Sequence, residues 1–405
     1  MTKTEISKNL RVIAARAFLD GLASSMMNTV RQPFILSLGT PMSTLGLLES
    51  LGGQKGLLPA LVQFVGGWLS DRVGRKPFML LGIVGSLSSA AFYILAAITG
   101  DWRWLLPGVV FAGIVLIARP AQNSLVAESA HTSQRGMAYS IFIAAWIVPG
   151  IFAPALGGLV ADRWGYIPIF SLRLLLEGIC LFVILRFLCE TLSQSNGVAS
   201  LGKLKEALVK IAAPPKALRS FYWAMALDSF AWGIGGSLFF GMLNETYGLT
   251  TFQLGVMSSL SSIVWAIFQL PIGKWIDRYG SKPSMVISEI IGILILTGRL
   301  FSTSFPAFAF LHACFGLLAA TWLPAQRSLL ANNVTENQRG EAMGRLAAFQ
   351  GLVGFPTPYL GGLLYERFGF NAPILASLIG VIIVTVVIIV AIKEPRSAGA
   401  ADGNG

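Results

Sequence analysis

Charged residues are scarce in this chain, at 12% of its 405 residues, whereas a soluble domain carries about 25%. Hydrophobic residues make up 54% of the sequence, and the mean hydropathy is +0.69. Such a chain has more apolar side chains than a soluble core accommodates, so it needs lipid to face. The composition therefore argues against an ordinary soluble protein.

Histidine and cysteine are also rare, with 2 and 3 residues respectively. His131 and His312 have no partner at ligand spacing, and Cys180, Cys189 and Cys314 lie inside or at the end of apolar runs. Neither a disulfide framework, nor a metal site, nor any other cofactor is expected. The sequence also lacks a Gly-x-x-x-x-Gly-Lys-Ser/Thr phosphate loop, and no enzyme active site is evident.

The chain does contain a series of long apolar runs. A bilayer core of about 30 Å requires about 20 mostly apolar residues per helix. By that rule the sequence predicts an all-α membrane protein with twelve transmembrane helices. The predicted spans are 12–36, 44–70, 78–99, 104–126, 137–160, 167–189, 219–243, 252–275, 284–301, 307–330, 343–364 and 371–392.

The net charge of +11 is unevenly distributed among the loops. If the N-terminus is cytoplasmic, most Lys and Arg fall in the inner loops and tails, and the outer loops and their edges hold Arg103, Arg163, Arg299 and Arg367. This asymmetry follows the positive-inside rule, so we expect an integral protein of the cell (inner) membrane with both termini cytoplasmic. The charge then reports topology and contact with anionic membrane lipids, and no nucleic-acid partner is expected.

Two six-helix bundles are expected, over residues 1–190 and 219–394. The polar segment 191–218 between them contains Pro214 and Pro215 and more basic than acidic residues, so it is predicted to be a cytoplasmic linker. The short basic N-terminus leads directly into the first span, which argues against a cleavable signal peptide. The Gly- and Ala-rich tail 395–405 is expected to be disordered.

The two halves repeat each other. The charged segment Gly67–Lys76 recurs as Gly273–Lys282, and each copy ends one apolar run and is followed by proline and the next run. Other matches keep the same order and spacing. They are Leu19-Asp20 with Leu227-Asp228, Gln122 with Gln326, Gln134-Arg135-Gly136 with Gln338-Arg339-Gly340, and the Pro154–Gly158 segment with Pro358–Gly362, each followed by an acid, Arg and Gly.

With these residues the whole chain resembles a twelve-helix transporter of the major facilitator superfamily. The resemblance implies two pseudo-symmetric halves that rock around a site near the midplane. The first charged segment matches the family pattern at Gly67, Leu69, Asp71, Arg72, Gly74, Arg75 and Lys76. The second keeps Gly273, Asp277, Arg278, Gly280 and Lys282, with Ser281 in place of the first copy's Arg.

Within that superfamily, Arg119-Pro120-Ala121-Gln122 resembles the Arg-x-x-Gln motif of drug–proton antiporters. The antiporter motif of the fifth span is present at Gly150, Pro154, Gly157 and Gly158, but Ala153 replaces the glycine expected before proline. The resemblance therefore implies the fold fully and antiport only in part.

Gating is expected at the charged segments, where the carboxylates of Asp71 and Asp277 would form charge-assisted hydrogen bonds that close the inner side. The alternative is that these residues serve topology and turn geometry alone, with Gly74 and Gly280 permitting the turns. Near the outer edge, two oppositely charged residues are expected to form a second latch. The predicted gating residues are Gly67, Asp71, Arg72, Gly74, Arg75, Asp277, Arg278, and the latch pair Arg31 and Glu49.

Ionisable residues inside spans are costly and are functional candidates by default. From the rise of 1.5 Å per residue, Asp20 and Arg119 lie roughly 13 Å and 10 Å deep. In the family fold their helices are neighbours, so we hypothesise a proton-coupling pair in which protonation of Asp20 releases Arg119. Asp228, the repeat counterpart of Asp20, is a third candidate. The alternative is a static salt bridge or a residue at the membrane edge.

Substrate contacts are expected from polar and aromatic residues within the spans. Lys55 would hold an anionic group or pair with Glu49, whereas Arg173 and Glu177, four residues apart, suit a structural pair. The predicted substrate-binding residues are Asn28, Lys55, Arg119, Gln122, Trp232 and Gln350.

Because the phosphate loop is absent, energy is expected from an ion or substrate gradient. The favoured hypothesis is a monomeric secondary active transporter that works by alternating access and exports amphiphilic or drug-like compounds in a proton-coupled cycle. Two alternatives stay open. One is proton-coupled uptake of a metabolite or organic anion, and the other is a lipid flippase on the same scaffold.

Overall fold

The computed structural model describes residues 3–53, 56–130, 135–192, 214–215, 218–334 and 339–392. The described part of the first half consists of α1 (Lys3–Ser37), α2 (Met42–Gly52), α3 (Leu57–Val73), α4 (Arg75–Thr99), the short 3-10 helix η1 (Trp102–Trp104), α5 (Leu105–Val115), α6 (Ala118–Glu128), α7 (Arg135–Trp164) and α8 (Ile167–Phe187). That of the second half consists of α10 (Arg219–Gly236), α11 (Phe239–Tyr247), α12 (Thr251–Tyr279), α13 (Ser281–Phe301), α14 (Phe305–Asn332), α15 (Arg339–Gly354), α16 (Thr357–Phe368) and α17 (Asn371–Ala391).

These helices form the twelve predicted passes, because four passes are interrupted. The interrupted passes are α2–α3, α5–α6, α10–α11 and α15–α16. Proline accounts for two of the breaks: Pro120 and Pro356 lack an N–H to donate and crowd the carbonyl four residues earlier. Glycine accompanies the break after Gly52 and the one after Gly236, where it weakens a helix. Predicted spans and observed passes thus agree in number and order.

Among the described residues, nine helical segments, including the interrupted passes α5–α6 and α10–α11, are long and apolar enough to cross a membrane. The predicted first, second and eleventh spans are outside that set. The first pass, α1, carries Arg16, Asp20 and Arg31 along its length. Charged residues lower the mean hydropathy of a span, and charged residues inside a membrane bundle are candidates for function.

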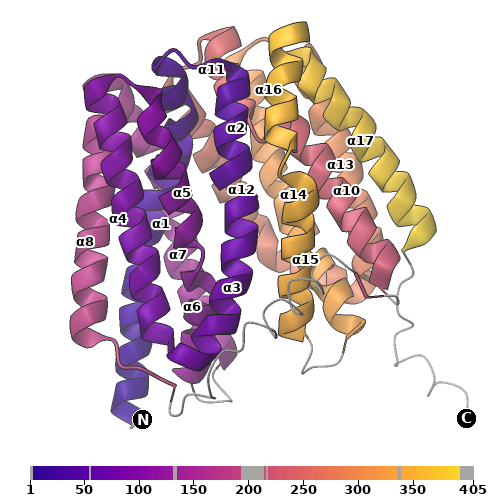
Figure 1. Cartoon of the computed structure of the whole chain (residues 1–405). Coiled ribbons are helices and arrows are strands. Elements are labelled where there is room, and N and C mark those ends of the chain that lie inside the picture. Colours follow the sequence, from indigo (N-terminus) through magenta and orange to yellow (C-terminus); the bar gives the residue numbers. More distant parts are fainter. Residues whose placement is uncertain are drawn as a thin grey trace, which may run out of the picture.

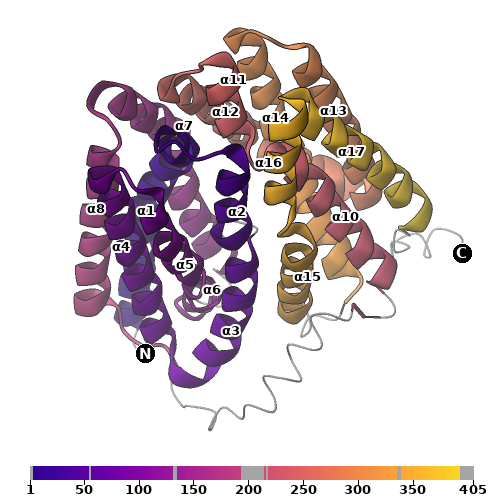
Figure 2. The ribbon, with the colours of Figure 1, turned by 45° about the horizontal axis from the view of Figure 1, so that its top comes forward.

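The two halves stand side by side, and α1 begins at the same end of the molecule at which α17 ends (Figure 1). We call this end the terminal face and the other end the opposite face. Figures 1 and 2 show the halves close together toward the opposite face and diverging toward the terminal face. Each half has its own aromatic cluster: Phe34, Tyr93 and Phe170 in the first, and Tyr247, Phe308 and Phe370 in the second.

Near the opposite face the halves meet mainly along α7 with α12 and α2 with α16, and α1 also contacts α11 and α12. The contact, which we call the seam, is main chain against main chain. A Cβ at Gly158 would overlap the carbonyl of Thr251, and one at Gly46 would overlap that of Pro358. Glycine is therefore needed here because two backbones approach too closely for any side chain.

Candidate functional site

The first charged segment forms the predicted tight turn between α3 and α4. Gly74 has a φ of 125°, a conformation open to glycine, and Gly280 has 95° at the second copy. The carboxylate of Glu190, just after α8, accepts hydrogen bonds from the backbone N–H groups of Arg75 and Lys76, both at 2.9 Å. A Cβ at Gly74 would lie 2.8 Å from Glu190 Oε2. Glu190 thus caps α4, and only glycine leaves it room.

Glu190 lies outside the membrane-spanning segments, and its pKa is lowered. Burial alone would raise this pKa, but hydrogen bonds from the backbone of Arg75, Lys76, Leu192 and Thr191 outweigh burial because they stabilise the charged form. The carboxylate therefore stays ionised and anchors the turn.

Arg75 is fixed as well, because its Nη2 forms an ion pair of 3.1 Å with Glu128 at the end of α6. These contacts lie within the first half. Of the other predicted gating residues, Gly67 packs against Pro120 and Arg72 is partly exposed, whereas the side chain of Asp71 lies outside the described residues. Sequence analysis missed Glu128 and Glu190, although each ends a helical pass.

The second charged segment repeats one contact of the first. Lys76 Nζ donates to the carbonyl of Leu188 at 2.8 Å, and Lys282 Nζ donates to that of Ile389 at 2.8 Å. A lysine thus satisfies the carboxyl-terminal carbonyls of the last helix in each half. Asp277 is exposed, and the Arg278 guanidinium lies 5.3 Å from the ring centre of Tyr279.

Asp20 belongs to a charge network inside the first half. It accepts a hydrogen bond of 3.1 Å from Ser24 and interacts electrostatically with Arg119 on α6. Both residues are described, and no ion pair within 4.0 Å joins them. The predicted pair is therefore an interaction at longer range.

The same network includes Glu177 on α8, which is 2% exposed and interacts with Asp20, Arg173 and Arg16. Its Oε1 lies 4.0 Å from Arg173 Nη2 and accepts a 2.8 Å hydrogen bond from Ser86, so the predicted structural pair is present. Arg16, 4% exposed, was not anticipated, although a basic residue inside the first span was a visible signal.

The second half contains a different arrangement of acids. Asp228 on α10 is 5% exposed and Glu289 on α13 is 2% exposed, and their carboxyl groups interact with each other. Trp232 also interacts with Glu289, and its ring lies edge-on to Phe315 at 5.6 Å. Glu289 was missed by sequence analysis, although it is an acid within the apolar run 284–301.

Arg31 and Glu49 form the expected ion pair, at 2.7 Å. Both belong to the first half, so the pair joins α1 to α2 and does not cross the seam. Its role as a latch stays a prediction.

The predicted substrate residues come from both halves. Asn28 is exposed and Gln122 is buried, while Gln350 donates from Nε2 to the carbonyl of Met225 at 3.0 Å. Arg119 is exposed and interacts with Arg327 on α14 of the second half as well as with Asp20. Lys55 lies outside the described residues.

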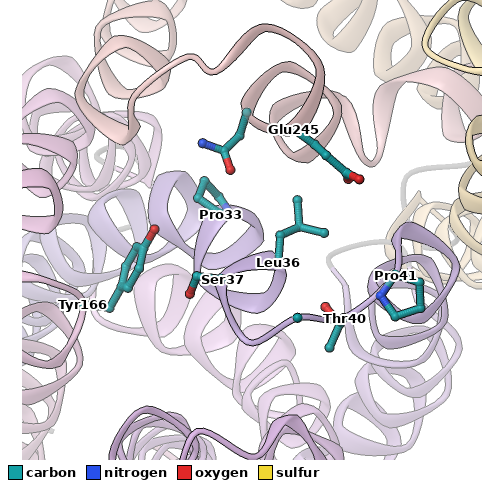
Figure 3. Close-up of a pocket in the computed structure, with 9 residues that line it drawn as sticks. Pro33, Leu36, Ser37, Thr40, Pro41, Tyr166 and Glu245 are labelled. Atoms are coloured by element: carbon teal, nitrogen blue, oxygen red, sulfur yellow. The ribbon is translucent and has the colours of Figure 1, made fainter.

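A pocket of about 510 Å³ opens at the opposite face (Figure 3). Its walls come from both halves, with Tyr166 and Glu245 on different sides of Pro33 and Leu36 (Figure 3). None of the predicted substrate residues lines it. The pocket therefore lies over the seam and is separate from the predicted substrate site.

Side chains reinforce the seam beneath this pocket. Gln32 donates to the carbonyl of Ser237 at 2.6 Å and accepts from the N–H of Gly241 at 2.8 Å. Ser50 accepts from the N–H of Tyr359 at 3.1 Å. Each of these contacts joins the two halves, so the opposite face is closed.

The family model described as Major Facilitator Superfamily matches residues 13–244 and 221–404. The chain belongs to this superfamily. It is therefore a membrane transporter and not an enzyme, and the twelve-helix fold predicted from its sequence is confirmed.

Curated members of the superfamily with similar sequences include the multidrug resistance protein MdtG of Salmonella arizonae, 23% identical over 369 residues and 90% of each chain. The MdtG of Enterobacter lignolyticus is 23% identical over 376 residues, which cover 91% of this chain and 88% of the relative.

Solved superfamily structures share the fold. The human organic anion transporter MFSD10 (TETRAN) has a TM-score of 0.69 at 18% identity and covers 95% of this chain and 99% of its own. A bacterial homologue of the lysosomal transporter Spinster, in an inward-facing and unoccupied conformation, has a TM-score of 0.72 at 15% identity, with 96% and 97% coverage. A POT family transporter in complex with 5-aminolevulinic acid has 0.76 at 14%, with 94% and 95% coverage.

Proposed function

We propose that this transporter exports small amphiphilic or drug-like compounds from the cell in exchange for protons. The observation that carries the proposal is the similarity to multidrug resistance proteins over 90% of both chains. The Arg119–Gln122 segment in α6 supports it, because it resembles the Arg-x-x-Gln motif of drug–proton antiporters.

Orientation follows from the distribution of basic residues. The terminal face carries most Lys and Arg, so it is assigned to the cytoplasm by the positive-inside rule. With the opposite face closed at the seam, the substrate site would open toward the cytoplasm. This is the state in which an exporter loads its substrate.

Proton coupling is assigned to carboxyl groups inside the bundle. Asp20 interacts with Arg119, and Glu177 interacts with both Asp20 and Arg16. Protonation of Asp20 would remove one negative charge from this network and leave Arg119 less strongly held. A proton can therefore change the position of a residue that faces the substrate, which is the link that coupled transport requires.

A reconstitution assay tests this proposal. Purified protein in liposomes, with a pH-sensitive dye inside, is given amphiphilic drugs, and substrate-dependent proton movement is recorded. The expected result is movement with native protein and its loss in Asp20→Asn, while Asp101→Asn, which alters a partly exposed carboxylate near η1, behaves as native. Proton movement that survives Asp20→Asn would contradict coupling through Asp20. Substrate movement without protons would contradict antiport.

A second candidate function, uptake of an organic anion, is favoured by Arg119 and Arg327. These exposed guanidinium groups come from opposite halves and repel each other. A bound carboxylate or phosphate would relieve that repulsion. The same liposomes separate the two candidates. An anion that enters together with protons acidifies the lumen, whereas a drug that enters in exchange for protons makes the lumen more alkaline.

A further inference from the structure

Two acids at the opposite face cap helices across the seam. Asp162, near the end of α7, accepts hydrogen bonds from the first two N–H groups of α12, namely Thr251 N to Oδ1 at 3.0 Å and Phe252 N to Oδ2 at 2.8 Å. Glu366, near the end of α16, accepts from Ser43 N in the first turn of α2 at 2.7 Å. In each case the acid and the capped helix belong to different halves.

The two caps are related by the internal repeat. Asp162 is followed by Arg163 and Glu366 by Arg367, and each acid comes four residues after a seam glycine, Gly158 or Gly362. A Cβ on either glycine would overlap main chain of the helix that its acid caps. A close backbone approach and an acid cap thus occur together at both places. In one the first half supplies the acid, and in the other the second half supplies it.

The physical basis is the unsatisfied start of a helix. The first N–H groups of a helix have no partner within it, and its dipole favours a negative charge there. Thr250 already caps α12 with its own side chain, so Asp162 takes the neighbouring donors. The residue before α2 is Pro41, which forms no side-chain cap. Glu366 is therefore the carboxylate available to the start of α2.

We propose that Asp162 and Glu366 form a two-point clasp that sets the fraction of molecules closed at the opposite face. The caps exist only while the halves are together. When the halves separate, the N–H groups and the carboxylates form hydrogen bonds with water instead. The clasp therefore acts on the equilibrium between closed and open states. The Arg31–Glu49 pair cannot act in this way, because both of its residues move with the same half.

A rival explanation is that each acid only stabilises the start of the helix it touches. That role would change the stability of the protein without changing the distance between the halves. The two explanations are separated by a distance measured across the seam without any substrate. This measurement is also independent of the proposed substrate and of the coupling ion.

The experiment is a double electron–electron resonance measurement on full-length protein in lipid nanodiscs. Cys180, Cys189 and Cys314 are first replaced by serine. Spin labels are then attached through Ser37→Cys in the first half and Thr303→Cys in the second, both exposed near the opposite face. The test variants are Asp162→Asn, Glu366→Gln and their double, because an amide keeps the size and an acceptor oxygen but loses the charge.

Loss of a charge at a helix start changes an equilibrium by about two- to fivefold. Each single variant is expected to raise the odds of the longer distance by that factor, and the double variant by the product of the two. Asp162→Glu, which keeps the charge, is expected to stay closer to native than Asp162→Asn.

Asp101→Asn is the matched control. Asp101 also accepts a backbone N–H, from Arg103 at 2.9 Å, but within its own half. A native distance distribution in the double variant would overturn the clasp, with or without a lower melting temperature. An equal shift in Asp101→Asn would overturn it too, because the effect would then come from surface charge in general.

Discussion

Asp228 on α10 and Glu289 on α13 interact with each other, and both are almost fully buried. Their first-half counterpart is built differently, since Glu177 interacts there with two arginines, Arg16 and Arg173, as well as with Asp20. The first half therefore compensates its buried acids with cations. In the second half Glu289 interacts instead with Asp228 and Trp232.

Removing one member of this buried acid pair tests whether the pair takes part in proton-coupled transport. Glu289→Gln is expected to abolish substrate-dependent proton movement in liposomes, because an amide cannot release and regain a proton. Exchange of labelled substrate across the membrane is expected to continue, since it needs no net proton transfer. Full proton movement in Glu289→Gln, measured beside the control Asp101→Asn, would restrict the pair to a structural role.

The buried ion pair of Arg31 and Glu49 leads to a stability prediction. Glu49→Ala leaves the Arg31 guanidinium without its carboxylate, and breaking a buried pair costs about 3–5 kcal/mol. The melting temperature in detergent is therefore expected to fall clearly. Replacing both residues, as Arg31→Met with Glu49→Leu, is expected to restore most of the loss, and a double variant as unstable as Glu49→Ala would argue against this account.

The seam glycines lead to a packing prediction. Gly158→Ala places a methyl group against the Thr251 carbonyl, and overpacking of this kind costs about 1–3 kcal/mol. The cost falls on the closed state, so the distance between labels at 37 and 303 is expected to shift toward the open population. Gly178→Ala on α8, where an added Cβ meets open space, is the control. Equal behaviour of the two variants would contradict the prediction.

Glu190 leads to a prediction about pH. Because its pKa is lowered in the folded protein, its contribution to stability is present above the unfolded value of about 4.3. That contribution is lost as the pH falls through the folded value. Glu190→Gln is therefore expected to melt below native protein at neutral pH and to approach it in acid. Melting curves from pH 7 down to pH 3 measure this, and a difference that stays constant with pH would exclude ionisation as the cause.

Sequence reasoning succeeded where information is local or repeated. Twelve passes followed from hydropathy, and the turns at Gly74 and Gly280 followed from the duplicated charged segment. The pair Arg173–Glu177 followed from helical spacing. The ion pair Arg31–Glu49 followed from placing both residues at the same membrane depth.

Contacts between segments far apart in the chain were not accessible in the same way. Depth along a helix says how far a residue lies from the membrane surface, but not which neighbouring helix it faces. For this reason Asp228 was identified without Glu289, and the turn at Arg75 without Glu190. Asp162 and Glu366 were noticed only as part of the repeat, since a partner that is a backbone N–H leaves no mark in the side-chain sequence.

The seam has a consequence for how this protein tolerates change. Its closest contacts use main-chain carbonyl groups, which every residue supplies in the same form. Side chains around the seam are thus free to diversify while the halves still recognise each other, provided that a few glycines and acids keep their places. Contact of this kind leaves the joint between the halves independent of the side chains that would contact the cargo.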